Sequence, residues 1–199
     1  MLIIGLNGSP QKEGNTAGLL LAALKAAHEM GAETRLLHVT DALHGIKQPF
    51  CINCTPVCEG ACARENNLGE AFDLLRRADG IIIGSPVYFG TVSAQLKAFW
   101  DKSRVLRKEK VLVNVIGGAV AVGAARFGGQ ETTVKAIHDI MLVQGMTVIG
   151  DGYFADDAGH QGACAQRPSL EDTAGLLRAG VMGRRVAELA QATMGLRQR

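Results

Sequence analysis

Short apolar runs alternate along the chain with longer segments in which apolar residues recur at helical spacing. The short runs predict strands at residues 2–6, 34–39, 80–84, 110–116 and 147–149. The longer segments predict helices at residues 15–30, 67–78, 93–105 and 130–144, and a final helix that is capped within 169–172 and runs to Ala192. Strands that alternate with helices in this way predict a parallel sheet with helices on both faces.

The predicted strands are continuously apolar, as in Ile81-Ile82-Ile83, which is typical of strands buried on both faces. For a chain of 199 residues this pattern favours an α/β three-layer sandwich with five strands in the order 2-1-3-4-5. No repeat or linker divides the chain, so we expect a single domain over residues 1–199, with an insertion at residues 41–66.

Composition and charge exclude several classes of partner. The net charge is only +2 and the basic residues are scattered, so a nucleic-acid partner is not expected. The first apolar run has no basic leader and stops at Asn7, too early for a signal peptide. The longest apolar stretch, residues 111–125, contains Asn114 and three glycines and is too short to span a bilayer. We therefore predict a cytoplasmic protein without a membrane partner.

The predicted topology also predicts where a ligand binds. In an open parallel sheet of this order, ligands bind at the carboxyl ends of the strands, where the strand order reverses between the first and third strands. The loops to consider are residues 7–16, 85–91 and 117–131.

The first loop is typical of a phosphate site. It is rich in small and hydroxyl residues and leads directly into a helix, whose free N–H groups and dipole favour an anion. Ser9, Asn15 and Thr16 can add hydrogen bonds. The loop does not end in the Gly-Lys-Ser/Thr of a P-loop, which disfavours a magnesium nucleotide, and it lacks the Gly-x-Gly-x-x-Gly motif of dinucleotide-binding proteins. A phosphate monoester therefore fits the loop best. The alternative is that Ser9 forms a turn while Asn15 or Thr16 only caps the helix.

The other two loops favour a flat apolar ring. Tyr88 and Phe89 are adjacent in a chain with only 5% aromatic residues, and they can form the wall that such a ring requires. The alternative is that both rings pack on the next helix or on a neighbouring subunit. The third loop carries five glycines, which permit close approach of the backbone to a ligand, and Gly118 is therefore a candidate cofactor-binding residue.

Together the loops resemble the NADPH-dependent FMN reductase family of flavodoxin-like proteins. The matching stretches are Gly8-Ser9-Pro10 with Asn15-Thr16, the segment GSPVYFG at residues 84–90, and the segment GGQET at residues 128–132. The resemblance covers residues 1–150. It implies a flavodoxin-like fold, FMN as cofactor, an NAD(P)H-dependent oxidoreductase that passes electrons to an acceptor, and a homodimer or homotetramer.

The resemblance also assigns the cofactor-binding residues. It implies that Ser9, Gln11, Asn15 and Thr16 hold the FMN phosphate. It implies that the isoalloxazine is lined by Pro86, Val87, Tyr88, Phe89 and Gly90. Many relatives carry Arg in place of Gln11, so Lys12 is a candidate for the compensating charge. FMN itself supplies the redox chemistry, so we expect no catalytic side chain.

Four of the five cysteines lie within twelve residues, in the irregular segment 41–66. The iron–sulfur flavoproteins of the same family carry a compact cysteine motif at this place, and this chain resembles them most. Cys51, Cys54, Cys58 and Cys62 offer the four thiolates that a 4Fe-4S cluster requires. Three residues separate Cys54 from Cys58, where the family typically has two. Zinc bound by the four thiolates, or a reversible thiol–disulfide pair between Cys51 and Cys54, are the alternatives.

Two other functions remain open at this point. One is an electron carrier with FMN and a cluster but no turnover with NAD(P)H, and the other is a zinc- or thiol-based redox sensor. The fifth cysteine, Cys164, has no paired neighbour, and we expect an incidental thiol in a surface loop at residues 159–167. Trp100 is expected to pack in the core or at a subunit contact rather than on the flavin.

Overall fold

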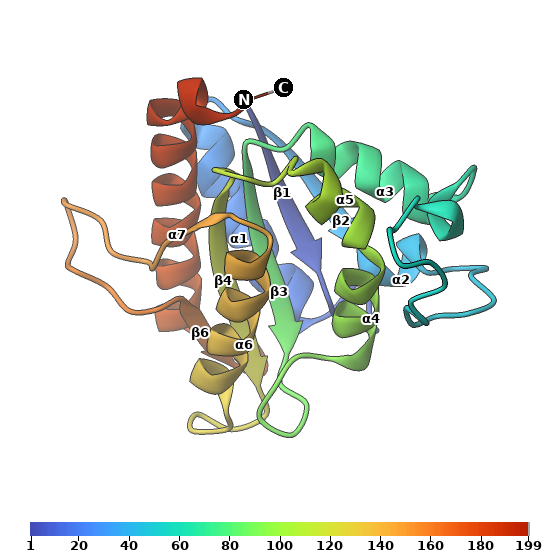
Figure 1. Cartoon of the computed structure of the whole chain (residues 1–199). Helices are drawn as coiled ribbons and strands as arrows, with labels where there is room; N and C mark the ends of the chain where they lie inside the picture. Colours follow the sequence, from blue (N-terminus) through green and yellow to red (C-terminus); the bar gives the residue numbers. More distant parts are fainter. Residues whose placement is uncertain (199) are drawn as a thin grey trace.

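One parallel sheet forms the centre of the molecule, and the computed structural model describes residues 1–198 (Figure 1). The strands are β1 (Leu2–Asn7), β2 (Glu33–His38), β3 (Gly80–Pro86), β4 (Ile116–Gly123), β5 (Thr147–Val148) and β6 (Ala163–Gln166). Their order is β2-β1-β3-β4-β5, with β6 also paired to β4, and all pairs are parallel. The predicted α/β sandwich and its strand order are confirmed.

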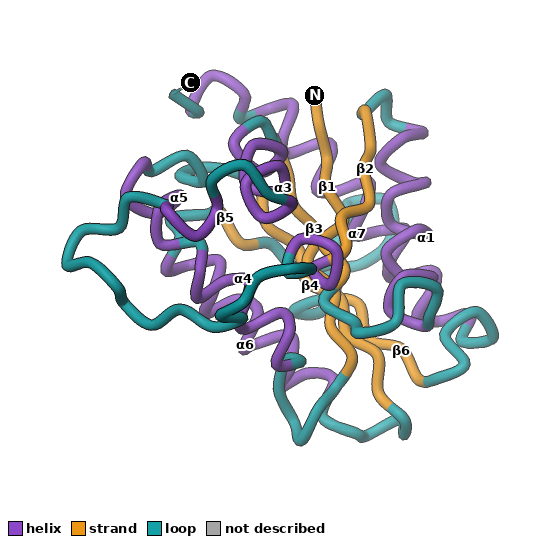
Figure 2. The backbone as a smooth tube through the Cα atoms, turned by 90° about the vertical axis from the view of Figure 1, so that its right-hand side faces the viewer, coloured by secondary structure: helices purple, strands orange, loops and turns teal. Residues whose placement is uncertain are grey.

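Helices cover both faces of the sheet, which Figure 2 shows as the middle layer. On one face α1 (Asn15–Glu29) packs against α7 (Thr173–Ala192). The other face is covered by α3 (Asn67–Arg76), α4 (Ala94–Lys102), α5 (Arg104–Glu109) and α6 (Gln130–Val143). The short helices are α2 (Val39–Ala42), η1 (Ala61–Ala63) and η2 (Met194–Leu196). Within residues 1–198, no helix is long and apolar enough to cross a membrane.

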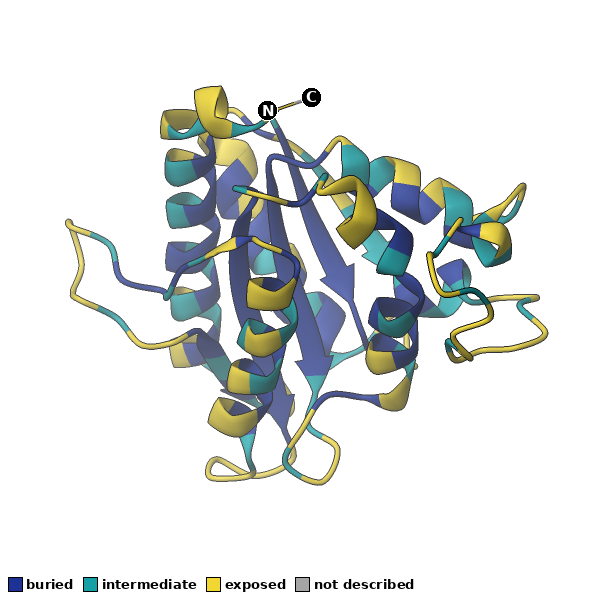
Figure 3. Ribbon diagram, in the orientation of Figure 1, coloured by how far each residue is buried: buried dark blue, intermediate teal, exposed yellow. Residues whose placement is uncertain are grey.

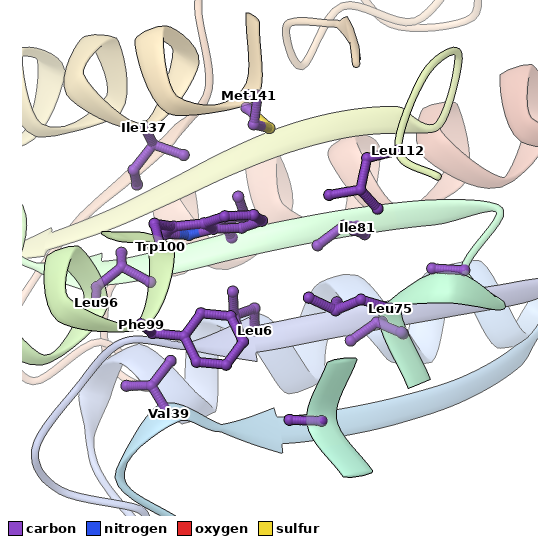
Figure 4. Packing of buried hydrophobic residues seen from close by; sticks show 14 of the residues in the cluster. Leu6, Val39, Leu75, Ile81, Leu96, Phe99, Trp100, Leu112, Ile137 and Met141 are labelled. Atoms are coloured by element: carbon purple, nitrogen blue, oxygen red, sulfur yellow. The ribbon is translucent and has the colours of Figure 1, made fainter. Parts of the chain in front are cut away.

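Successive residues of a strand point to opposite faces of the sheet and so belong to two separate hydrophobic clusters, one on each face. Ile81 and Ile83 belong to the cluster under α3, α4 and α6, whereas Ile82 faces α1 and α7. The central strands β1 and β4 are buried throughout and β3 nearly so, whereas the edge strand β2 is partly exposed, and the helices are buried only on their inner faces (Figure 3). Trp100 packs inside the first cluster beside Phe99, as predicted, at a ring-centroid distance of 5.7 Å (Figure 4).

The outer edge of the sheet is divided between two short strands. Thr147 in β5 pairs with Ile116, and Ala163 in β6 pairs with Val120, so both strands follow the same edge of β4. Residues 149–162 leave the sheet between them as the projecting orange loop of Figure 1. The sequence predicted no strand at β6, because four residues of alanine, cysteine and glutamine carry little β signal.

The predicted strand at residues 110–116 is wrong, because β4 begins only at Ile116. Lys110 and Asn114 adopt left-handed backbone conformations, with φ of 60° and 65°, which end α5 and turn the chain. Leu112 and Val115 lie in this turning segment, and both side chains are fully buried. Their burial produced an apolar pattern that resembles a strand.

Two helix boundaries also differ from the predicted ones. Helix α3 begins at Asn67 as predicted, with Asn66 as its N-cap because its side chain accepts hydrogen bonds from the N–H groups of Leu68 and Gly69, but it ends at Arg76, two residues before the predicted end. The predicted helix at 93–105 is interrupted at Ser103, where α4 ends and α5 begins. The final helix is capped by Asp172, which lies within the predicted segment.

The close packing of α1 on α7 depends on Gly183. A Cβ atom at this position would overlap the carbonyl oxygen of Ala23 in α1, whereas a Cβ at Gly180 in the same helix meets nothing within 4 Å. We expect Gly183→Ala to lower the free energy of unfolding by about 3 kcal/mol. Gly180→Ala, the matched control, should raise it by up to about 1 kcal/mol. Chemical denaturation measures both, and equal effects of the two substitutions would contradict this account of the interface.

Candidate functional site

The loops that follow β1, β3 and β4 meet at one edge of the sheet. The N–H of Gly8 donates to the carbonyl oxygen of Gly84 at 2.8 Å, which joins the first loop to β3. The N–H of Val87 donates to the carbonyl oxygen of Val122 at 2.9 Å, which joins the second loop to β4. The loops after β3 and β4 lie side by side at the lower end of the molecule in Figure 1. The predicted convergence of the three loops is therefore present.

The first loop leads to an uncapped helix terminus. Gly14 is the N-cap residue of α1, and no side chain caps it among residues 1–198. The first helical hydrogen bond runs from the N–H of Gly18 to the carbonyl oxygen of Gly14, so the N–H groups of residues 15–17 have no carbonyl partner within the helix. The first turn of α1 carries no acidic side chain. This terminus suits a phosphate group, because the free N–H groups and the helix dipole both favour an anion.

Side chains hold the first loop in shape. The Asn7 side-chain oxygen accepts from the N–H of Ser9 at 3.0 Å, and the Ser9 Oγ accepts from the N–H of Gln11 at 3.1 Å. Asn7 is fully buried, and its Nδ2 lies 3.0 Å from Nδ1 of His38. Burial lowers the pKa of His38, which favours the neutral ring beside Asn7. The turn expected at Ser9 is thus present, and it leads into an open helix terminus.

The predicted phosphate-binding residues are not equivalent in the structure. Ser9 and Thr16 are buried at the loop, and Gln11 is exposed. The Asn15 side-chain oxygen accepts from the N–H of Ser169 at 2.8 Å, so it ties α1 to the segment before α7. Lys12 forms an ion pair with Asp41 and is therefore already neutralised by another partner.

The second loop presents aromatic side chains to solvent. Residues Tyr88 and Thr91 form a tight hairpin through two backbone hydrogen bonds of 3.0 and 3.1 Å. At its tip Phe89 adopts a left-handed φ of 50°, which is unusual for a bulky residue, and its side chain is fully exposed. Tyr88 is 45% exposed. Neither ring is covered by the next helix, so the alternative of packing on that helix does not describe this loop.

An apolar groove adjoins the aromatic loop, between α4 and α6. Its cavity volume is about 850 Å³, which lies in the range of small-molecule sites. Tyr88 and Phe89 form one wall, and the others come from both helices: Val92, Ala94, Gln95, Lys97, Ala136, Asp139 and Ile140. The second loop thus offers a large apolar surface next to the carboxyl ends of the strands.

Gln130 organises the third loop, and sequence reasoning missed this role. Its side-chain Nε2 donates to the carbonyl oxygen of Ala125 at 2.6 Å, and its Oε1 accepts from the N–H of Gly128 at 2.9 Å. The side chain is 4% exposed, which is unusual for glutamine and could not be read from the sequence. The Thr132 Oγ1 donates to the carbonyl oxygen of Gly90 at 2.7 Å and fixes the second loop against the third.

Gly118 lies away from these loops. It is the third residue of β4 and is buried, and a Cβ atom there would meet Met182 of α7. Its lack of a side chain serves the packing of α7 on the sheet, so we leave Gly118 out of the site proposed below.

The cysteine-rich segment lies beside α4 and α5. Cys51, Cys58 and Cys62 are partly buried and Cys54 is exposed. Burial raises the pKa of the Cys62 thiol; the positive charge of Lys102 opposes this, and the neighbouring Cys58 and Cys51 reinforce it. Across residues 1–198 no group of three or more His, Cys, Asp or Glu side chains is placed to hold a metal ion.

Cys164 does not lie in a surface loop, and that prediction is wrong. It is part of β6, and its side chain lines a cavity of about 230 Å³ between α6 and α7. Burial, with smaller contributions from Glu131 and Asp151, raises the pKa of its thiol to about 12. The thiol is therefore neutral at physiological pH.

Comparisons with known proteins agree with this geometry. The family model of the NADPH-dependent FMN reductases matches residues 1–161. An iron–sulfur flavoprotein of Methanocaldococcus jannaschii is 44% identical over 197 residues, which cover 96% of this chain and 98% of the relative. An iron–sulfur flavoprotein of Methanosarcina thermophila is 38% identical over 88% of each chain. A solved WrbA-like flavodoxin from Agrobacterium tumefaciens superposes with a TM-score of 0.69 at 20% identity, covering 96% of this chain and 97% of that one.

The fold and the converging loops define a flavodoxin-like protein, and the structural likeness supports that fold. The chain belongs to the NADPH-dependent FMN reductase family and is an FMN-binding flavoprotein, with iron–sulfur flavoproteins among its relatives.

The raised pKa of Cys164 predicts a slow thiol. At pH 8 about one Cys164 side chain in ten thousand is a thiolate, so iodoacetamide should label it far more slowly than the exposed Cys54. In the unfolded chain, where the ordinary value of 9.0 applies, the difference should vanish. Because the folded pKa is the higher one, this thiol stabilises the fold below pH 9 and ceases to do so as the pH rises toward 12. Peptide mass spectrometry of labelled protein measures both rates, and rapid labelling of Cys164 in the folded chain would contradict the burial.

Proposed function

We propose that the protein is an NAD(P)H-dependent reductase that passes electrons through FMN, and through an iron–sulfur cluster, to an acceptor. The support is the convergence of an uncapped helix terminus, an exposed aromatic loop and a glycine-rich loop at the carboxyl edge of the sheet. FMN, when bound, supplies hydride acceptance and electron transfer. The protein supplies binding and orientation, and no side chain is required as a general acid or base.

The phosphate of FMN is assigned to the terminus of α1. The N–H groups of residues 15–17 have no helical partners, and Ser9 and Thr16, whose hydroxyl groups can donate to a phosphate, are buried at this loop. Gln11 is exposed at the mouth of the loop and is free to approach the phosphate. Asn15 contributes its backbone N–H, because its side-chain oxygen already accepts from Ser169.

The isoalloxazine is assigned to the loop from Pro86 to Gly90. Tyr88 and Phe89 offer apolar surface to one side of a flat ring, and the backbone of Val87 and Gly90 is held in place by hydrogen bonds to β4 and α6. The large exposed area of Phe89 and the adjoining groove also favour a homodimer or homotetramer, in which a second subunit covers the ring edge.

The cluster is assigned to Cys51, Cys54, Cys58 and Cys62. The donor set fits, because four thiols on one short segment match the ligand count of a 4Fe-4S cluster and both sequence relatives described above are named iron–sulfur flavoproteins. No three of these thiols are grouped to hold a metal in the described residues, so the segment must rearrange when a cluster binds. Zinc uses the same ligands, so metal analysis decides between the two.

Anaerobic purification tests the function directly. The spectrum should show flavin and iron–sulfur absorption, metal analysis should find iron and not zinc, and NADPH or NADH should bleach the flavin band at a catalytic rate. A loaded protein that is reduced by dithionite but not by either nucleotide would make it an electron carrier. Zinc without flavin would instead support the redox sensor.

The phosphate assignment predicts a selective defect in Thr16→Val. Valine keeps the shape of threonine and its contact toward Gly84 but removes the hydroxyl group. Loss of a hydrogen bond to a charged group costs about 1.5–3 kcal/mol, so FMN affinity should fall about tenfold to a hundredfold. Riboflavin, which has no phosphate, should bind the variant and the parent equally. Thr193→Val, at the far end of α7, is the matched control. Equal losses for FMN and riboflavin in fluorescence titrations would place the phosphate elsewhere.

A further inference from the structure

The segment between β6 and α7, residues 167–172, lies against the first turn of α1. Its Ser169 is fully buried and forms two hydrogen bonds with Asn15, the first residue of that helix. The Ser169 N–H donates to the Asn15 Oδ1, and the Ser169 Oγ donates to the Asn15 carbonyl oxygen, both at 2.8 Å. The family model ends at residue 161, so this contact comes from a part of the chain that the family model does not match.

Hydrogen bonds at both ends hold this segment in place. The N–H of Arg167 donates to the carbonyl oxygen of Gly123 at 2.9 Å, which ties the start of the segment to the end of β4. At the other end, the Asp172 carboxylate accepts from the N–H groups of Gln166 at 2.8 Å and Gly175 at 2.9 Å. These hydrogen bonds lower the pKa of Asp172, so the carboxylate keeps its charge and both partners at neutral pH. The segment is therefore a fixed support for α1.

The absence of a side chain at Gly18 leaves room for this support. A Cβ atom at Gly18 would lie 3.0 Å from the side chain of Leu170 and 3.5 Å from the Ser169 Oγ. The first of these distances is shorter than an ordinary contact between carbon atoms, so a larger residue would press the segment away from the helix. The first turns of α1 thus allow the segment to approach closely, beside the residues assigned to the phosphate.

The contact with Ser169 decides which way the side-chain amide of Asn15 faces. A backbone N–H donates only to an acceptor, so the oxygen of the amide faces Ser169 and the nitrogen is directed elsewhere. The Asn15 Nδ2 donates no hydrogen bond within residues 1–198, and it is not among the buried atoms that lack a partner. Its two N–H bonds therefore remain accessible at the start of α1, in a turn without an acidic side chain.

We propose that Ser169 is a positioning residue for the FMN phosphate, because it holds the Asn15 amide so that Nδ2 donates to a phosphate oxygen. This inference rests on the phosphate site at the terminus of α1 in the proposed function. It adds one oriented side-chain donor to the backbone N–H groups of residues 15–17. An amide that is held in place before FMN arrives loses little rotamer freedom on binding, so its hydrogen bond costs less entropy. The segment before α7 thereby becomes part of the cofactor site.

Ser169→Ala tests the positioning. The substitution removes the hydrogen bond from Oγ to the Asn15 carbonyl oxygen and loosens the segment from α1. FMN affinity should fall about threefold to tenfold, because Nδ2 is no longer held in place, whereas riboflavin should bind the variant and the parent equally. Ser103→Ala is the matched control, since Ser103 is also fully buried and donates to a backbone carbonyl oxygen, and it should change neither affinity. Fluorescence titrations of FMN-depleted protein measure both ligands.

Asn15→Asp separates the oxygen of the amide from its nitrogen. Aspartate still accepts from the Ser169 N–H, and its charge favours the helix dipole, so the midpoint of thermal unfolding of FMN-free protein should rise by about 1–4 °C. The variant lacks the Nδ2 donor and repels a phosphate, so FMN affinity should fall about a hundredfold or more while riboflavin affinity is kept. A residue with a purely structural role would affect the two ligands equally.

The outcomes separate this inference from the proposed function. A parent protein that binds FMN and riboflavin equally overturns the phosphate site and this inference together. A parent that prefers FMN, with Ser169→Ala weakening both ligands equally or neither, overturns the role of Ser169 alone. Retained FMN affinity in Asn15→Asp overturns the donor role of Nδ2.

Discussion

The central constraint of this structure is the start of α1, where backbone N–H groups face outward without a cap. A helix terminus normally recruits a side-chain oxygen, and α3, α4 and α7 all do so through Asn66, Ser93 and Asp172. Helix α1 begins instead at Gly14, immediately after a loop shaped by Asn7 and Ser9. An anion from outside the chain is the natural partner of such a terminus. The position of this terminus fixes where the rest of the cofactor lies.

Rigidity around that terminus comes from polar side chains that bind backbone groups. Ser93 donates to the carbonyl oxygen of Gly8, Thr132 donates to that of Gly90, and Gln130 spans the third loop. Each of these contacts joins a loop to the neighbouring strand or helix, so the three loops are positioned before any ligand arrives. Such preorganisation lowers the entropy cost of binding, and it leaves the exposed Phe89 as the adaptable part of the site.

The sequence predicted the sheet order, the three loops and the family, because buried parallel strands and glycine-rich turns leave strong local patterns. It could not separate strand from turn at residues 110–116, since Leu112 and Val115 are buried in either case. The sequence also suggested Gly118 as a ligand-binding residue, because a glycine permits close approach of either a ligand or a helix. Only the structure, in which Met182 packs over this position, shows that the close approach is that of a helix. The role of Gln130 depends on hydrogen bonds to residues far along the chain, which leave no local sequence pattern. The strand that contains Cys164 likewise depends on its pairing with β4 and has no local signal of its own.

A crystal structure of the anaerobically purified, FMN-loaded protein tests the central claim most directly. The account predicts the FMN phosphate within hydrogen-bond distance of the N–H groups of residues 15–17, with the ring against residues 86–90. A phosphate bound at any other helix terminus, or a ring separated from Tyr88 and Phe89 by the protein's own side chains, would contradict it.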